Sequence, residues 1–193
     1  MEETLIIQEL QKGNESAFKQ FVDQYQQQVV NTCFGMVRNS EDAQDIAQEV
    51  FIEVFRSIHK FRADAKISTW LYRISVNRSL NFIRDNKKTK WFQSFEDKVE
   101  SNMSQFKKLN NAQSDQPEYE LENKERGIIL QEAINSLPEN QKVAFSLSKY
   151  EELSYQEISE IMELSISSIE SLLHRAKKNL QNKLYKCYKK KCF

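Results

Sequence analysis

The sequence of 193 residues contains little glycine and proline, with three glycines and two prolines. Collagen-like chains are therefore excluded, and an all-β fold, which needs glycine-containing turns about every dozen residues, is disfavoured. The longest apolar runs have only a few residues, well short of the ~20 that span a bilayer. The first residues lack the basic and apolar regions of a signal peptide. We therefore expect a helical, cytoplasmic protein without membrane insertion.

Cysteine and histidine are also scarce and widely spaced. Cys33, Cys187 and Cys192 form no CxxC pair, and His59 and His174 lie far apart in the sequence. This spacing predicts free thiols and no metal site. The sequence has no glycine-rich phosphate loop and no nucleophile elbow. We accordingly expect no catalytic residues, no cofactor and no enzyme activity.

The chain has no excess of one charge, because 28 Lys and Arg balance 28 Asp and Glu. The charges are nevertheless unevenly distributed: residues 61–90 carry a net charge of +6, residues 139–170 of −5, and residues 171–193 of +8. A locally positive surface favours contacts with nucleic-acid phosphates, whereas the acidic stretch is poorly suited to duplex DNA. The basic residues over 171–193 also complement the negative C-terminal end of a helix dipole, and this explains part of their excess there.

Apolar residues recur at helical intervals in the first half of the chain. Residues 4–38 read as two helices broken at Gly13 and Asn14. The clearest periodicity lies in residues 41–58, where an apolar stripe should face a core. Its members are Ala47, Val50, Phe51, Val54, Phe55 and Ile58. A further helix is expected over residues 68–85, followed by a polar linker over 92–117.

The second half of the chain predicts shorter helices around Pro138. One helix ends before this proline and another begins at it. Ser154 and Glu157 form a capping-box pattern that should start a third helix. The break Glu163-Leu164-Ser165 separates this helix from one beginning at Ile166. Two short helices joined by a tight turn indicate a helix-turn-helix.

Three sequence blocks now identify a family. DAQDIAQEVFIEVFRSI, KFRADAKISTWLYRISVNRSLNFIR and SLPENQKVAFSLSKYEELSYQEISEIMELSISSIESLLHRAKKNL closely resemble the extracytoplasmic-function (ECF) group of the sigma-70 family of bacterial RNA polymerase initiation factors. The resemblance implies an all-α protein with two small helical domains joined by a flexible linker. The implied parts are sigma region 2 over 1–91, the linker over 92–117, the region 4 helix-turn-helix over 118–186 and a basic tail over 187–193.

The helix over residues 41–58 also has a charged face that includes an exposed apolar residue, Ile52, which suits a docking surface better than a purely solvated one. In the family, this helix binds the coiled coil of the polymerase β′ clamp. The resemblance therefore implies that Asp45, Gln48, Glu49 and Ile52 bind the clamp, whereas Phe51 and Phe55 are expected in the core.

The basic stretch over residues 61–90 corresponds to the part of the family that opens the minus-10 element and captures an extruded base. Asn77 matches the base-reading position, and its amide has both a donor and an acceptor. The simpler interpretations are that Trp70 packs in the core and that Asn77 is a polar residue on the helix surface. The implied minus-10 residues are Arg62, Lys66, Thr69, Trp70, Arg73, Asn77 and Arg78.

The minus-35 reader departs from the family pattern. Ile166, Ile169, Leu173 and Ala176 should face inward, and the outward side offers Ser167, Ser168, Ser171, His174, Arg175 and Lys178 to a major groove. However, Glu170 and Leu172 stand where the family usually has basic residues, and Glu163 stands where it often has glycine. A carboxylate repels phosphates, although Glu170 could instead accept from a cytosine amino group. Recognition of the minus-35 element should therefore be weak or altered.

The partners implied are core RNA polymerase, through its β′ clamp and β flap, promoter DNA, and an anti-sigma factor. A weak minus-35 reader would also need polymerase contacts or a DNA-bound recruiter to place it. The linker fits either a simple tether or a segment that runs toward the RNA exit path. Two rival interpretations are a helix-turn-helix regulator, which leaves the clamp-like helix unexplained, and a polymerase-binding adaptor that no longer reads DNA, which leaves Asn77 unexplained.

Overall fold

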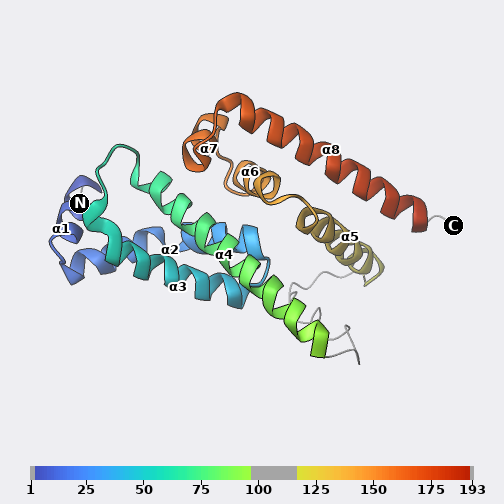
Figure 1. The fold of residues 1–193 in the computed structure, drawn as a ribbon, viewed down its shortest axis with the longest axis horizontal. Helices are drawn as coiled ribbons and strands as arrows, with labels where there is room; N and C mark the ends of the chain where they lie inside the picture. The colour runs from blue at the N-terminus through green and yellow to red at the C-terminus, as the bar shows by residue number, and fades with distance from the viewer. Residues whose placement is uncertain (1–2, 97–116, 192–193) are drawn as a thin grey trace. The chain divides into compact units, whose positions relative to one another are not determined.

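The structure is a computed structural model that describes residues 3–96 and 117–191. All regular structure in these ranges is helical (Figure 1). The elements are α1 (Glu3–Gln11), α2 (Glu15–Val37), α3 (Ser40–Ser57), the 3-10 helix η1 (Ile58–Lys60), α4 (Ile67–Glu96), α5 (Pro117–Asn135), α6 (Glu139–Lys149), α7 (Tyr155–Met162) and α8 (Ile166–Lys191). The all-α fold class expected from the sequence is confirmed.

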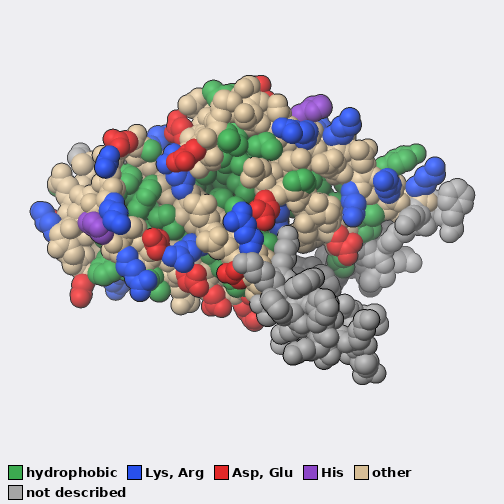
Figure 2. All heavy atoms as spheres, in the orientation of Figure 1, with side chains coloured by type: hydrophobic (Ala, Val, Ile, Leu, Met, Phe, Trp, Pro, Cys, Tyr) green, Lys and Arg blue, Asp and Glu red, His purple; other side chains and the backbone are tan. Residues whose placement is uncertain are grey.

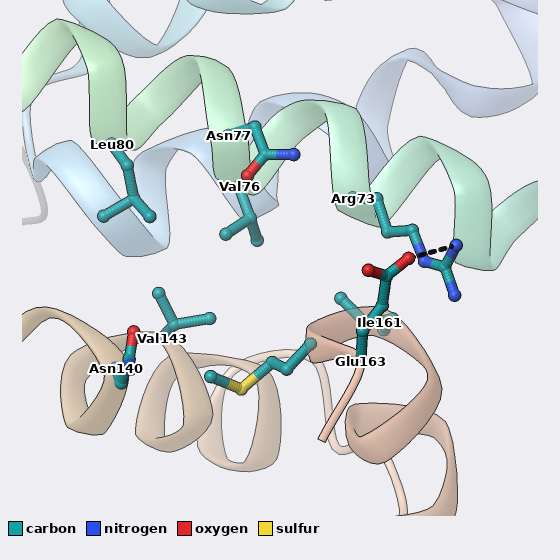
Figure 3. Close-up of a pocket in the computed structure, with 9 residues that line it drawn as sticks. Arg73, Val76, Asn77, Leu80, Asn140, Val143, Ile161 and Glu163 are labelled. Carbon is teal, nitrogen blue, oxygen red and sulfur yellow. Dashed lines mark ion pairs between the residues drawn. The ribbon is translucent and has the colours of Figure 1, made fainter.

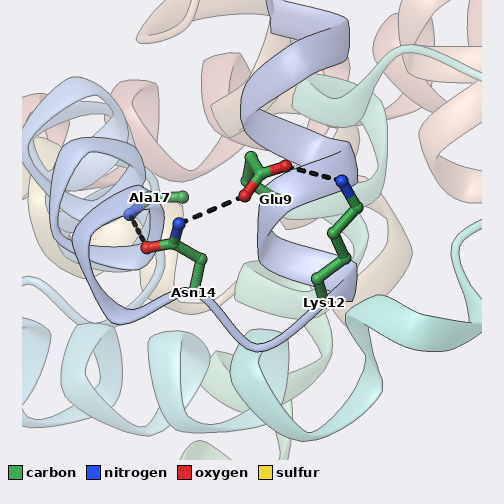
Figure 4. Close-up of polar contacts among 4 residues, drawn as sticks. All are labelled: Glu9, Lys12, Asn14 and Ala17. Carbon is green, nitrogen blue, oxygen red and sulfur yellow. Dashed lines mark hydrogen bonds and ion pairs between the residues drawn. The ribbon is translucent and has the colours of Figure 1, made fainter.

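The break between α1 and α2 depends on Gly13 and Asn14, as predicted. Gly13 has a φ of 79°, which glycine adopts without strain. Asn14 caps α2, because its Oδ1 accepts from the backbone N–H groups of Ser16 and Ala17 at 2.9 and 3.2 Å (Figure 4). Its Nδ2 donates to Glu9, which also pairs with Lys12 at 2.7 Å. These contacts tie the end of α1 to the start of α2.

Two helix lengths differ from the sequence expectation. α4 continues to Glu96 rather than ending near Asp85, because residues 86–96 contain neither proline nor glycine to break the helix. α8 reaches Lys191, so most of the predicted basic tail continues this helix. Most of the predicted linker, residues 97–116, lies outside the described residues.

By their contacts, the helices form two compact units. The first comprises Met1–Ile83 with Pro138–Ala176, and the second Arg84–Leu137 with Lys177–Phe193. In the second unit, the end of α5 buries Ala133 and Ile134, and α8 buries Leu180. The domain boundaries expected from the sequence, at 1–91 and 118–186, remain a prediction.

The first unit contains two apolar clusters. One joins α1, α2, α3, η1 and the start of α4, with Phe21, Val50 and Leu71 at 0 or 1% exposure. The other joins the end of α2 and the middle of α4 to the helix-turn-helix. Its buried members are Met36, Val76, Val143, Ala144, Leu147, Ile158, Ile161 and Ile169. Helices α2, α3 and α4 therefore form a scaffold with outward faces that carry the candidate sites.

Candidate functional site

The first candidate surface is the outward face of α3. Asn39 starts this helix by accepting hydrogen bonds from the backbone N–H groups of Glu41 and Asp42. The helix buries one face and leaves the four residues of the predicted clamp surface exposed: Asp45, Gln48, Glu49 and Ile52. Ile52 is half exposed among carboxylates. Sequence reasoning thus placed these four side chains correctly on the outer face.

The core assignment on α3 was right for Phe51 and wrong for Phe55. Phe51 is 7% exposed, but Phe55 is 51% exposed and contacts Phe18 edge-on at a centroid distance of 5.1 Å. Five other apolar residues of the stripe and its flanks are buried: Ile46, Ala47, Val50, Val54 and Ile58. Phe55 lies at the edge of the stripe, so neighbouring helices cover one side of its ring only.

The predicted minus-10 residues lie along the connection before α4 and its first three turns. Arg62 and Lys66 are exposed. Trp70 is partly buried and packs on Phe61 at 5.3 Å between ring centroids, so the ring serves the core as well as the surface. Thr69 is only 4% exposed. The structure therefore does not support a direct DNA contact by Thr69, because its short side chain points into the core.

Farther along α4, Arg73, Asn77 and Arg78 follow at helical spacing. The amide of Asn77 is exposed, and together with Arg73 it lines a cavity of about 210 Å³ (Figure 3). The other walls come from Val76 and Leu80 of α4 and from residues of α6, α7 and the turn after α7. These are Asn140, Val143, Ile161, Met162 and Glu163. The predicted base-reading position therefore lies beside a built hollow rather than on a flat helix face.

Two arginines of α4 form ion pairs that the sequence did not predict. Arg73 Nη1 lies 3.0 Å from Glu163 Oε1 (Figure 3), and its Nε and Nη2 donate to the Glu160 carbonyl. Arg78 pairs with Glu53 at 2.6 Å and approaches Glu49 at 3.8 Å. The partners are 25 or more residues apart in sequence, so no local pattern could have revealed them. Both predicted DNA contacts are thus held by carboxylates in this structure.

The helix-turn-helix has the predicted start and turn. Ser154 caps α7 and forms a complete capping box with Glu157. Glu163 ends α7 with a φ of 55°, in the left-handed region where glycine is least strained. The glycine that the resembled family pattern often has at this position would adopt this conformation without strain. The turn is therefore formed in this chain at some backbone cost.

The recognition helix presents a largely polar outer side. Ser167, Ser171, His174, Arg175 and Lys178 are exposed, as expected, whereas Ser168 is half-buried. Figure 2 shows Lys and Arg side chains along the C-terminal part of α8.

Two predictions on the recognition helix were wrong. Ile166 is 43% exposed rather than inward, because it is the first residue of the helix and lies beyond the core. Leu172 is partly buried against the second apolar cluster, so it stabilises packing instead of occupying a DNA-facing position. Glu170 is exposed. Of the two departures from the family pattern on this helix, Glu170 is therefore the one that is placed to affect DNA binding.

A buried polar group lies where the α6–α7 connection contacts α2 and α4. Tyr72 Oη donates to Glu151 Oε2 at 3.3 Å. Burial raises the pKa of Glu151 above its usual value, and hydrogen bonds from Tyr72 and Thr32 offset this only in part. Burial also raises the pKa of Tyr72. Nearby, the Arg38 guanidinium stacks over the Tyr150 ring at 3.9 Å. Aromatic packing, a cation–π contact and the Tyr72–Glu151 hydrogen bond therefore meet in this region.

Glu151→Gln is therefore expected to make the protein more stable at neutral pH. Because the folded-state pKa of Glu151 is raised, its ionisation opposes folding as pH rises through that value, and glutamine removes this penalty while still accepting from Tyr72. The advantage should disappear below the ordinary glutamate pKa of 4.5. Urea unfolding across this pH range checks it, with the exposed Glu152→Gln as control. An equal gain at all pH values would contradict the explanation.

The cysteines that the structure describes are free. Cys33 is fully buried, and burial raises the pKa of its thiol to about 11, so the reactive thiolate is scarce at neutral pH. Cys187 is also unpaired, and Cys192 lies outside the described residues. Within residues 3–96 and 117–191, no three metal-ligating side chains gather at one point, and no helix could cross a membrane.

Comparisons with known proteins agree with this geometry. Residues 21–89 match the profile of sigma-70 region 2, and residues 128–180 match that of sigma-70 region 4. The ECF RNA polymerase sigma-E factor of Haemophilus influenzae is 32% identical over 179 residues, covering 93% of each chain. The ECF RNA polymerase sigma factor SigW of Bacillus subtilis is 31% identical over 178 residues, covering 92% of this chain and 94% of its own.

Solved structures share the fold at lower identity. CnrH in complex with the cytosolic domain of CnrY is 18% identical, with a TM-score of 0.63, covering 93% of this chain and 95% of its own. The sigma factor RpoE in complex with the anti-sigma factor NepR from Bartonella quintana is 19% identical, with a TM-score of 0.59, covering 87% and 96%. With full-length relatives above 30% identity, the chain belongs to the ECF group of the sigma-70 family of RNA polymerase factors.

Proposed function

We propose that this sigma factor binds core RNA polymerase through the outer face of α3 and directs initiation by reading and opening the minus-10 element with α4. Sigma-70 factors are initiation factors without a catalytic activity of their own, as expected from the sequence. The observation that carries the proposal is the pairing of two exposed surfaces on one scaffold. One is the carboxylate face with Ile52, and the other is the face of α4 with the exposed Asn77.

The polymerase contact suits the chemistry of the α3 face. Asp45, Gln48 and Glu49 offer acceptors to a basic partner, and the half-exposed Ile52 offers an apolar anchor one turn farther along the helix. A rival function as a helix-turn-helix regulator would need no such face. The direct test is binding of the purified chain to core polymerase in competition with another sigma factor. Binding that another sigma factor does not displace would contradict the proposal.

The minus-10 role rests on α4 and the connection before it. Arg62 and Lys66 are exposed and can contact phosphates, which supplies affinity without sequence information. Asn77 is exposed and carries both a donor and an acceptor, so it can discriminate an unpaired base edge. We place Trp70 as a support for this surface, since its ring packs on Phe61. A polymerase adaptor that does not read DNA would not need Asn77.

Recognition of the minus-35 element is proposed to be weak. The outward side of α8 carries short hydroxyl side chains and the exposed carboxylate of Glu170, in a stretch with a net charge of −5. The basic residues lie farther along α8, where they can add affinity that does not depend on sequence. We propose that polymerase contacts, including the β flap, or a DNA-bound recruiter place this module at promoters.

Glu170→Lys is expected to strengthen binding to a minus-35 duplex. The change removes a carboxylate that repels phosphates and adds a cation, so affinity at low salt should rise about tenfold and the salt dependence should steepen by about one counterion. Glu170 is exposed, so folding should not change. Fluorescence titrations at several salt concentrations measure the effect.

Glu152→Lys is the matched control for this variant, because it makes the same charge change in the acidic stretch but off the recognition helix. An equal gain from both variants would indicate a general charge effect. A loss of preference for one cytosine position would instead show that Glu170 reads a base, and would contradict the proposed repulsion.

Three further features of the proposal follow from the family. Two relatives of this fold, CnrH and RpoE, were solved in complexes with CnrY and the anti-sigma factor NepR, which supports an anti-sigma partner for this chain. We also propose a cytoplasmic location in a bacterium. The boundaries at 1–91 for region 2 and 118–186 for region 4 complete the proposal, with residues 92–117 as the linker.

A further inference from the structure

Arg78 connects the two surfaces on which the proposed function depends. It lies on α4, next to Asn77 in sequence, yet its side chain turns to α3. There Nη2 lies 2.6 Å from Glu53 Oε2, and Nη1 lies 3.8 Å from Glu49 Oε2. Glu49 belongs to the proposed polymerase-binding face. One guanidinium therefore contacts two carboxylates of the neighbouring helix.

The two carboxylates need a cation between them. Glu49 and Glu53 are four residues apart on α3, so their side chains lie one above the other and repel each other. A planar guanidinium with several N–H donors can bind both carboxylates at once, which an ammonium does less well. Arg78 therefore offsets their repulsion, and its hydrogen bond to Glu53 restricts the direction in which that side chain points.

The exposed fractions of Arg78, Glu49 and Glu53 indicate that the two carboxylates have different roles. Glu53 and Arg78 are 37% and 36% exposed, whereas Glu49 is 61% exposed. Glu53 is thus the anchor of Arg78, because it lies closer to the guanidinium and is less exposed than Glu49. Glu49 keeps most of its surface free for a partner, and the Arg78 guanidinium attracts its charge from 3.8 Å without a hydrogen bond. A partner would meet a carboxylate whose position the nearby guanidinium favours, which lowers the entropy cost of binding.

The same geometry disfavours a DNA contact by Arg78. A phosphate placed on this guanidinium would lie close to two carboxylates and would be repelled by both. Arg62 and Lys66, in contrast, are exposed, although Lys66 lies near enough to the Glu157 carboxylate to help lower its pKa. They are better placed to contact phosphates than Arg78.

We propose that Arg78 is a positioning residue for the polymerase-binding face of α3, and that it does not contact promoter DNA. The inference rests on the proposed function, because it needs α3 to bind polymerase. It changes the role implied by the family resemblance, which placed Arg78 among the minus-10 residues. It also couples the two surfaces, since a single residue of α4 sets the geometry of the α3 face.

The test compares Arg78→Ala with Arg62→Ala in the full chain. Arg78→Ala should weaken binding to core polymerase about two- to fivefold. It should leave unchanged the salt dependence with which the assembled holoenzyme binds forked promoter DNA. Arg62→Ala should do the opposite, with normal polymerase affinity and a salt dependence lower by about one counterion. Thermal unfolding of each variant shows whether folding is intact.

A double-mutant cycle separates positioning from a general loss of charge. If Arg78 acts through its anchor, Arg78→Ala and Glu53→Gln together should weaken polymerase binding less than the sum of the single changes. Arg78→Lys should restore only part of the affinity for core polymerase, because an ammonium lacks the planar, forked set of N–H donors of a guanidinium. Additive effects would overturn the proposal.

Other outcomes are equally decisive. Unchanged polymerase affinity in Arg78→Ala, or a reduced salt dependence on DNA, would overturn the role of Arg78. Failure of the proposed function itself has a different signature, in which Ile52→Glu leaves polymerase binding intact. If Ile52→Glu weakens binding and Arg78→Ala does not, the α3 face stands and the inference about Arg78 falls.

Discussion

Asn77→Ala is expected to abolish the base preference at one minus-10 position and to slow promoter opening. An amide that makes two hydrogen bonds to a base edge contributes roughly 1–3 kcal/mol of discrimination, which is about 5- to 150-fold in relative affinity. Asn77 is exposed, so its truncation should leave folding unchanged. Because phosphate contacts are retained, the salt dependence of DNA binding should stay the same. Holoenzyme binding to forked promoters with each base at each minus-10 position measures the effect.

Asn86→Ala is the matched control for this prediction. It removes the same amide from the same helix, nine residues farther on and therefore on the opposite side. It should keep the base preference and the opening rate. A uniform loss of affinity for all sequences in Asn77→Ala, with a reduced salt dependence, would contradict base reading by Asn77 and would indicate a role near the backbone instead.

Ile52→Glu is expected to lower affinity for core polymerase by about 30-fold or more. Apolar anchors at the centre of an interface commonly contribute 2 kcal/mol or more when lost, and here a charge would also enter a face that already has several carboxylates. Ile52 is 50% exposed, so the free protein should fold normally. Titration of labelled protein with core polymerase gives the affinity, and thermal unfolding checks the fold.

Leu5→Glu provides the control, because Leu5 is a similarly exposed aliphatic residue, at 48%, on α1. It should bind polymerase as the unmodified chain does. Equal losses in both variants would mean that added negative charge, rather than the α3 face, weakens binding. No loss in Ile52→Glu would place the polymerase contact elsewhere.

Local features of the fold could be predicted because they depend on neighbouring residues. The break at Gly13 and Asn14, the capping box of Ser154 with Glu157 and the turn at Glu163 each follow from short-range backbone chemistry. The amphipathic stripe of α3 was predictable for the same reason. The end of α4 was not, since polar composition alone does not stop a helix when glycine and proline are absent.

Residues at the edges of apolar stripes were misjudged because helical periodicity does not say how wide the covering surface is. Phe55 and Ile166 were expected inside and are exposed, whereas Leu172 was treated as a DNA-facing position and is partly buried. Thr69 was assigned to DNA and is buried. In each case the outcome depends on which helix lies opposite, and that is a tertiary property.

The outward positions of the candidate site could be predicted, but not their pairing. The exposed face of α3 and the position of Asn77 followed from motif and spacing. The contacts of Arg73 with Glu163 and of Arg78 with Glu53 depend on how distant helices pack. These contacts bear on function, because they show which of the arginines already form ion pairs with carboxylates.

The most direct test of promoter reading is transcription in vitro with purified core polymerase, with and without this protein, on a library randomised across the upstream promoter. We predict start sites that require the protein, share a preference in the minus-10 element and show little preference in the minus-35 element. Strong preferences in both elements would contradict the weak minus-35 reader. Starts that need the protein but show no minus-10 preference would contradict the proposal that α4 reads and opens promoter DNA.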